Sequence, residues 1–222
     1  MSDKNPLEEY FFNNDKRLIH KWLHYFDIYH KFFQPFRGKK ITVVEFGVSH
    51  GGSLQMWKEY FGENAMIYGI DIDPRCKAME EDRVKVLIGD QADRKFLKSV
   101  RKQVGQIDIL IEDGGHRMDQ QIATFEELYP AIKEGGVFLI EDLHTSYWPE
   151  YGGGYKRPGT FTEYSKNLID QINAWHSIYG SGLRVDEYTK SIKGIHVYDS
   201  IIVFEKGAVK KPTHQQIGKP SF

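Results

Sequence analysis

The sequence predicts an α/β fold built around a mostly parallel sheet. Two observations carry that prediction: short apolar runs alternate with helical segments from residue 41 to residue 140, and two further apolar runs lie close together near residue 200. Alternation at this spacing is typical of β-α-β units, whose strands pair in parallel. The 222 residues suffice for one well-packed domain and leave little room for a second.

The first forty residues, 1–40, are predicted to form a helical extension ahead of that domain. Five apolar residues recur in it at steps of four, four, three and four: Leu18, Trp22, Phe26, Tyr29 and Phe33. These steps place them on one face of a helix, which we expect to pack on the main domain or on a partner subunit. Pro35 and Gly38 then interrupt the pattern.

The main domain is predicted to span residues 41–206, with helices on both faces of its sheet. Its elements are expected as parallel strands at 41–46, 66–70, 84–88, 107–111 and 137–140 and helices at 53–61, 96–104, 118–132 and 162–178. An antiparallel pair at the C-terminal end, 195–198 and 201–204, brings the sheet to seven strands. The basic tail, 207–222, is expected to be a mobile end, with an arm toward a neighbouring subunit as the alternative.

Composition excludes several classes of protein. Thirty basic and 31 acidic residues leave a net charge of −1, which argues against a surface that binds nucleic acid through its phosphates. A hydrophobic content of 40% argues against disorder. Cys76 is the only cysteine, which excludes an intrachain disulfide and a cysteine-based zinc site. We see no signal peptide or membrane-spanning run and expect a cytoplasmic protein without a membrane partner.

An acidic residue follows every predicted parallel strand, at the sheet edge where folds of this class bind ligands. The glycine-rich turn after the first strand lacks the Lys-Ser/Thr ending of an ATP- or GTP-binding loop and the Gly-x-Gly-x-x-Gly spacing of a dinucleotide fold. Asp71, about twenty residues after this turn, suits the two hydroxyls of a ribose. A glycine turn with acids and without phosphate chemistry favours a cationic nucleoside such as S-adenosylmethionine.

The residues predicted to contact this nucleoside come from the turns after the first four strands. Glu45 is assigned to its ammonium group, and Asp90 with Gln91 to the edge of its adenine. The full set is Glu45, Gly47, Ser49, Gly51, Ser53, Asp71, Asp90, Gln91 and Asp113. The alternative is that the glycines merely turn the chain.

Three carboxylates, Asp113, Glu141 and Asp142, follow the fourth and fifth strands, which should be neighbours in such a sheet. Like charges that converge repel one another unless a proton or a cation intervenes. Hard oxygen ligands suit Mg²⁺, with Mn²⁺ or Ca²⁺ as substitutes. The sequence therefore predicts a divalent-cation site, and solvated loop acids are the alternative for any one of the three.

A histidine and a group of aromatic residues complete the predicted site. His116 lies three residues after Asp113, and an imidazole there is suited to act as a general base on a hydroxyl group. The stretch 146–160 is expected to be a flap over the site or a surface loop anchored by its aromatics. Residues expected to contact the acceptor are His144, Tyr147, Trp148 and Tyr151.

The motifs Ile111-Glu112-Asp113-Gly114-Gly115-His116, Ile140-Glu141-Asp142 and Gly89-Asp90-Gln91 resemble those of a known family. The resemblance, over roughly residues 41–148, is to the metal-dependent sugar O-methyltransferases of macrolide biosynthesis, such as the mycinamicin and macrocin enzymes, and to the cephalosporin hydroxylase group. It implies a Rossmann-like class I methyltransferase fold that uses S-adenosylmethionine and Mg²⁺. By motif, Asp113, Glu141 and Asp142 would be the metal ligands, and Asp113 and His116 the catalytic residues.

These observations together predict a Mg²⁺-dependent O-methyltransferase that acts on a sugar hydroxyl, in a surface polysaccharide or a glycosylated natural product. The protein would work on a small-molecule or glycan acceptor, and we expect a homo-oligomer. A catechol-like phenolic acceptor and a non-catalytic S-adenosylmethionine-binding subunit are the alternatives. An oxidoreductase is disfavoured, because two histidines and one carboxylate do not converge in the predicted site.

Overall fold

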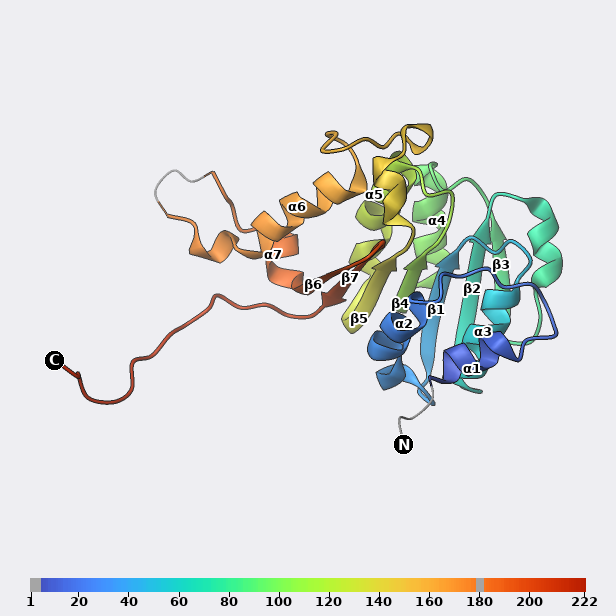
Figure 1. The fold of residues 1–222 in the computed structure, drawn as a ribbon, viewed down its shortest axis with the longest axis horizontal. Coiled ribbons are helices and arrows are strands. Elements are labelled where there is room, and N and C mark those ends of the chain that lie inside the picture. The colour runs from blue at the N-terminus through green and yellow to red at the C-terminus, as the bar shows by residue number, and fades with distance from the viewer. Residues whose placement is uncertain (1–4, 179–181) are drawn as a thin grey trace.

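Seven strands form one sheet, in the order β3-β2-β1-β4-β5-β7-β6, in the computed structural model of the chain (Figure 1). The structure describes residues 5–178 and 182–222. The strands are β1 (Ile41–Phe46), β2 (Ala65–Asp71), β3 (Val84–Ile88), β4 (Ile107–Glu112), β5 (Ile132–Ile140), β6 (Ile192–Tyr198) and β7 (Ile201–Lys206). The first five pair in parallel, and β7 runs antiparallel to both β5 and β6. The predicted mostly parallel, seven-stranded sheet is confirmed.

The strand order reverses next to β1, because the chain first builds outward to β3 and then returns to add β4 on the other side. Glu45 pairs in register with Ile111 and Phe46 with Glu112, so the turns after β1 and β4 begin side by side. Crevices at such a reversal are where open α/β sheets bind ligands.

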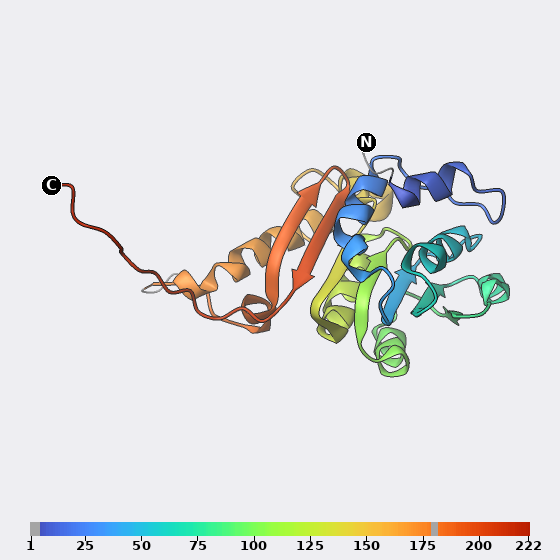
Figure 2. The same cartoon turned by 90° about the horizontal axis from the view of Figure 1, so that it is seen from below.

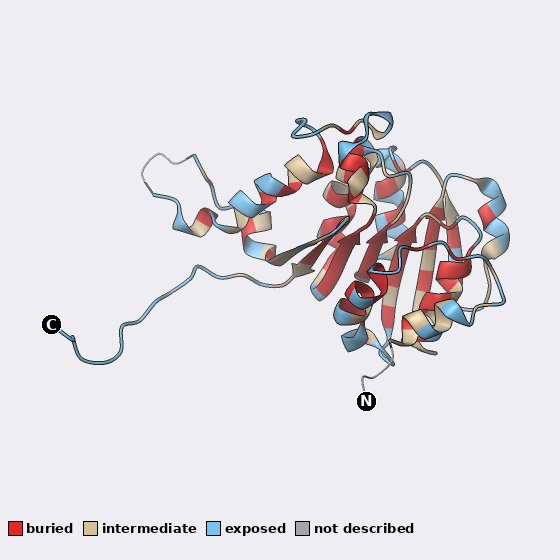
Figure 3. Ribbon diagram, viewed as in Figure 1, coloured by how far each residue is buried: buried red, intermediate tan, exposed pale blue. Residues whose placement is uncertain are grey.

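Helices cover both faces of the sheet, as predicted (Figure 2). The α-helices are α1 (Pro6–Phe12), α2 (Tyr25–Phe33), α3 (Gly52–Phe61), α4 (Arg94–Val104), α5 (Met118–Leu128), α6 (Phe161–Ile172) and α7 (Glu187–Ser191). Helices α1, α2 and α3 share one hydrophobic cluster with one face of the sheet, and α4, α5 and α6 share a second with the other face. The buried residues of the central strands separate the two layers (Figure 3).

The prediction of one helical face from Leu18 to Phe33 is wrong in its first half. Helix α2 begins at Tyr25 and buries Phe26, Tyr29 and Phe33 among the helices of its face. Leu18 and Trp22 lie before the helix and are 64% and 54% exposed. The residues between α1 and α2 instead run over the end of the sheet, where Ile19 and Lys21 are the buried ones. The predicted extension also includes residues 1–4, which lie outside the described residues.

Several element ends also differ from the prediction. The helix expected at 118–132 ends at Leu128, and after a single 3₁₀ turn (η3, Tyr129–Ala131) strand β5 begins at Ile132. The helix expected at 162–178 ends at Ile172. Residues 207–222 leave the sheet as an extended segment (Figure 1). Every helix among the described residues is too short or too polar to cross a membrane.

Candidate active site

A cavity of about 390 Å³ opens at the carboxyl ends of the parallel strands. The turns after β1, β2, β3, β4 and β5 line it, as the strand-end positions predict. The segment before α2, together with the first residue of that helix, forms a further wall, and the lining residues include Leu18, Lys21, Trp22 and Tyr25. The sequence did not predict this wall, because the residues before Tyr25 were expected to continue a helix that packs on the main domain or on a partner subunit.

Glycine at position 47 allows the β1 and β4 turns to meet. A Cβ at Gly47 would lie 1.9 Å from the backbone oxygen of Asp113, and the residue has φ +86°. Gly51, at φ +75°, caps the start of α3. At Gly47 the positive φ favours glycine and the close approach to Asp113 leaves no room for a side chain, so the fold requires glycine at this seam between the β1 and β4 turns.

Glu45 lies beneath the cavity and is fully buried. Its two carboxylate oxygens accept hydrogen bonds from Ser53 Oγ, at 2.7 Å, and from Trp57 Nε1, at 2.9 Å. Burial raises the pKa of Glu45 to about 7, although Lys21 opposes the shift. Glu45 and Ser53 thus support the floor of the site, and a contact between Glu45 and an ammonium group stays a prediction.

Asp71, at the end of β2, is held by backbone donors and lines the cavity. One carboxylate oxygen accepts the N–H groups of Val48 and Ser49 at 2.9 and 3.0 Å, and the other accepts the N–H of Asp73 at 2.9 Å. Partial burial would raise the pKa of Asp71, but these hydrogen bonds outweigh it and lower the pKa. Asp71 therefore carries a stable negative charge toward the cavity.

Asp90 and Gln91 follow β3 and also line the cavity. The Gln91 amide nitrogen donates to Glu112 and, at 3.0 Å, to Thr124 Oγ1, while its oxygen accepts the N–H of Gly115 at 3.1 Å. These bonds join the turn after β3 to the turn after β4. Gln91 therefore shapes the site, and its contact with an adenine stays a prediction.

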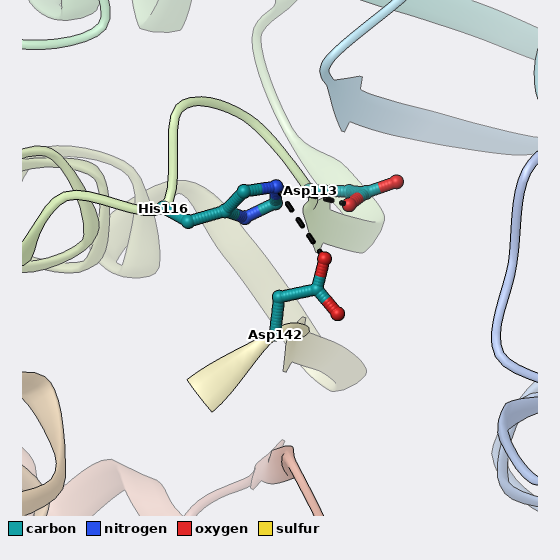
Figure 4. Close-up of side chains that lie close together, drawn as sticks. All are labelled: Asp113, His116 and Asp142. Carbon is teal, nitrogen blue, oxygen red and sulfur yellow. Dashed lines mark ion pairs between the residues drawn. The ribbon is translucent and has the colours of Figure 1, made fainter. Parts of the chain in front are cut away.

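Asp113, His116 and Asp142 lie close together at the junction of the β4 and β5 turns (Figure 4). His116 Nε2 is 3.4 Å from Asp142 Oδ2 and 3.9 Å from Asp113 Oδ1. One ligand-type atom of each residue falls within 4.8 Å of those of the other two. His116 and Asp142 both have φ +55°, a conformation that non-glycine residues rarely adopt and that is concentrated at functional sites.

Lys21 reaches into this acidic group from the segment before α2. Its Nζ donates to Asp113 Oδ2 and, at 2.9 Å, to Glu141 Oε2, and it lies 3.8 Å from Glu45 Oε1. Burial would lower the pKa of Lys21, but the charges of Asp113, Glu141 and Glu45 outweigh it and raise the pKa well above its usual value. Lys21 is a charged residue of the site that sequence reasoning missed.

Tyr25 is a second residue that sequence reasoning missed as part of the site. Its hydroxyl donates to Asp142 Oδ1 at 2.8 Å and accepts the Asp142 N–H at 3.3 Å. Lys21 and Tyr25 therefore each hold one oxygen of an aspartate, and the other oxygens of Asp113 and Asp142 face His116.

The chemistry of this group fits a divalent cation. Three carboxylates, Glu45, Asp113 and Glu141, lie within 4 Å of the Lys21 ammonium, and Asp142 adjoins Asp113 across His116, so the acids outnumber the one lysine among them. Burial and the neighbouring Asp113 raise the pKa of Glu141. Glu141 Oε1 is buried without a hydrogen-bond partner. Hard oxygen ligands with excess negative charge are the donor set that Mg²⁺ and Mn²⁺ prefer.

The residues predicted to contact an acceptor follow Asp142 in the chain. They lie in and next to the 3₁₀ helices η4 (Leu143–Tyr147) and η5 (Pro149–Tyr151). The His144 ring stands edge-on to Trp148, at 4.6 Å between centroids, and to Trp22, at 5.9 Å. Tyr151 lies 6.5 Å from the His116 ring. Tyr147 and Trp148 are about half exposed. These rings form an open aromatic surface next to Asp142.

Residues 44–143 match a family described as a methyltransferase domain. The match begins in β1, ends just after Asp142 and includes every predicted cation ligand. The chain carries a methyltransferase domain. Its fold also matches that of MycE, a methyltransferase from the mycinamycin biosynthetic pathway solved in complex with Mg, SAH and mycinamycin VI, with a TM-score of 0.79 and 32% identity over 92% of this chain and 53% of MycE.

Two curated relatives that match most of this chain are named as O-methyltransferases. An 8-demethyl-8-alpha-L-rhamnosyl tetracenomycin-C 2'-O-methyltransferase from Streptomyces olivaceus is 35% identical over 88% of this chain and 52% of its own length. The demethylmacrocin O-methyltransferase of Streptomyces fradiae is 35% identical over 86% of this chain and 51% of its own length. The chain thus spans about half the length of the curated relatives that it matches.

Proposed function

We propose that this protein is an S-adenosylmethionine-dependent O-methyltransferase that acts on a sugar hydroxyl and requires a divalent cation, Mg²⁺ or Mn²⁺. The observation that carries the proposal is the convergence of Asp113, Asp142 and His116 at the mouth of a cavity whose other end is lined by Asp71 and the glycine turn. The relatives named for sugar methylation and the MycE complex support it. We assign the methyltransferase domain to residues 41–206, between the helical extension and the tail.

The donor half of the cavity suits the nucleoside of S-adenosylmethionine. Asp71 presents a carboxylate that stays ionised, and a carboxylate in this place can accept hydrogen bonds from both ribose hydroxyls. Gly47 lines the facing wall, where its backbone is open to a ligand. Gly51 does not line the cavity, and we propose that it acts on the site only by shaping the turn before α3. Asp90, Gln91 and Ser49 border the same space. We propose that these residues bind and orient the donor.

The half of the cavity lined by Asp113, His116 and Asp142, here called the cation half, suits an acceptor hydroxyl that must lose its proton. Asp113 and Asp142, with Glu141 beneath them, would hold the cation, which when bound lowers the pKa of a neighbouring hydroxyl and orients it. His116 Nε2 would take the hydroxyl proton, and the carboxylates of Asp113 and Asp142 beside it stabilise the imidazolium that forms. The acceptor oxygen forms a bond to the methyl carbon while the bond between that carbon and the positively charged sulfur breaks. The electron pair of the broken bond stays on sulfur, so S-adenosylhomocysteine leaves as a neutral thioether.

The aromatic surface beside Asp142 is proposed to carry the acceptor. His144, Tyr147, Trp148 and Tyr151 offer ring faces and polar edges next to the cluster. Aromatic rings stack on the apolar faces of sugars and leave the hydroxyls free to reach the cation. The site would then fix the acceptor largely by position, so that binding energy lowers the barrier to transfer.

The test is a search for methylated product by mass spectrometry with S-adenosylmethionine, Mg²⁺ and a panel of methyl 6-deoxyhexosides, other glycosides and catechols. We expect a mass gain of one methyl group on a glycoside, with equimolar S-adenosylhomocysteine. Methylation of catechol alone would make the acceptor phenolic. S-adenosylhomocysteine binding by calorimetry with no product from any acceptor would favour a non-catalytic subunit.

A further inference from the structure

The ammonium group of Lys21 lies where two of the proposed cation ligands meet. Nζ is bonded to Asp113 Oδ2 and to Glu141 Oε2, which come from different strand ends, and only 3% of the lysine side chain is exposed. A cation shared by two carboxylates in a buried site is the role that Mg²⁺ would have for the same two residues. Lys21 and a divalent cation therefore need the same oxygen atoms.

The charge of the group is not balanced by Lys21 alone. One ammonium faces three carboxylates, and Glu141 Oε1 is buried with no hydrogen-bond partner. An unpartnered oxygen on a buried acid costs free energy, which a divalent cation would recover. Adding such a cation while Lys21 stays in place would bring two positive groups against Asp113 and Glu141, and they would repel each other.

Lys21 can leave without unfolding an element. It lies in the stretch between α1 and α2, whose exposed neighbours Leu18 and Trp22 face the cavity mouth. Close packing on α3 anchors the stretch as far as Ile19, because a Cβ at Gly52 would lie 2.4 Å from the backbone oxygens of Arg17 and Leu18 and 2.6 Å from Ile19 Cγ1. Displacing the Lys21 side chain from the carboxylates therefore requires only the few residues before Tyr25 to move.

We infer that the Lys21 ammonium and a divalent cation exchange for Asp113 and Glu141, so that Lys21 sets the cation affinity of the site. The inference rests on the proposed cation site and adds a residue to it. While Lys21 holds the two carboxylates, they are not competent to bind the cation, and the apparent affinity is reduced by the fraction of protein in that state. Removing the ammonium removes this competition.

The first experiment compares Mn²⁺ binding by electron paramagnetic resonance in the wild type, Lys21→Met and Lys16→Met. Lys16 is an exposed lysine of the same stretch and serves as the matched control. We expect K21M to bind Mn²⁺ at least about tenfold more tightly than the wild type, and K16M to match the wild type. If K21M does not fold without metal, Lys21→Gln, which keeps a neutral donor, takes its place.

The second experiment needs no variant. Wild-type protein is treated with acetic anhydride with and without Mg²⁺, and peptide mass spectrometry measures acetylation of Lys21 relative to Lys16. We expect Mg²⁺ to raise the Lys21 signal several-fold, because the displaced ammonium becomes exposed, and to leave Lys16 unchanged.

Equal or weaker Mn²⁺ binding by K21M overturns the exchange and leaves the cation site standing. Unchanged acetylation of Lys21 also overturns it, even if K21M binds more tightly, because loss of charge alone would then explain the affinity. Failure of the wild type and both variants to bind Mn²⁺ overturns the cation site together with the exchange.

Discussion

The two halves of the cavity are built in different ways. In the donor half, the Asp71 carboxylate accepts hydrogen bonds from backbone N–H groups in the turn after β1, about twenty positions away in the sequence. In the cation half, Asp113, Glu141 and Asp142 depend on Lys21 and Tyr25, which are 92 to 120 positions away, and one buried oxygen of Glu141 lacks a partner. The donor half is complete by itself, whereas we propose that a cation completes the cation half.

The largest effect is expected in the cation half, at His116. Replacing His116 with Ala removes the proposed base and should lower kcat for methyl transfer by about 10²- to 10⁴-fold, with S-adenosylhomocysteine affinity unchanged. Initial rates and calorimetry measure the two quantities. The exposed His176 provides the matched control, since His176→Ala should behave as the wild type. Wild-type turnover in H116A would remove the base from the mechanism.

The seam between the halves is tested at Gly47. Gly47→Ala would place a methyl group 1.9 Å from the Asp113 backbone oxygen and strain a backbone at φ +86°, so we expect a loss of about 3 kcal/mol or more in unfolding free energy. Gly152 has φ +82° and ψ 8°, in the left-handed helical region, and the nearest atom to its Cβ position, Met118 Cγ, is 3.8 Å away, so Gly152→Ala should lose only about 1 kcal/mol. Urea denaturation compares the two, and equal losses would contradict a tight seam.

Asp71 isolates the donor half. Asp71→Asn should weaken S-adenosylhomocysteine binding about tenfold, the loss of roughly one charged hydrogen bond, and leave Mn²⁺ binding unchanged. Because the folded state lowers the pKa of Asp71, its ionised form stabilises the fold above its usual pKa, and this contribution disappears as the pH falls through the lowered value. D71N should therefore lose part of the acid dependence of stability, and an identical pH profile would count against the hydrogen bonds of Asp71.

The smallest effect is expected at Tyr25. Tyr25→Phe removes both hydrogen bonds between the Tyr25 hydroxyl and Asp142, at a cost of about 1 kcal/mol each, and should weaken Mn²⁺ binding a few-fold with no change in S-adenosylhomocysteine affinity. Tyr155 is exposed, so Tyr155→Phe is the control. If Y25F weakened the binding of both ligands equally, the two halves would not be independent.

Much of the fold and the donor half could be predicted because their signals are local. The spacing of apolar residues, the turn residues and the acids located all seven strands. The glycine turn together with Asp71 indicated where a nucleoside would bind. The start of β5 was missed because Gly135 and Gly136 resemble a turn, although the strand continues through an irregular register there. Lys21 and Tyr25 could not be predicted as site residues, because their partners are distant in sequence. The apolar residues around them also fitted an amphipathic helix, which gave no reason to look for a site there.

The central claim is that the cation half drives methyl transfer, and its direct test is the rate of methyl transfer to a glycoside acceptor after treatment with chelator. Wild-type protein is dialysed against EDTA, assayed, and assayed again after Mg²⁺ is restored. We predict that transfer is lost with chelator and recovered with Mg²⁺, while S-adenosylhomocysteine still binds. An unchanged rate in the presence of EDTA would contradict the role assigned to Asp113, Glu141 and Asp142.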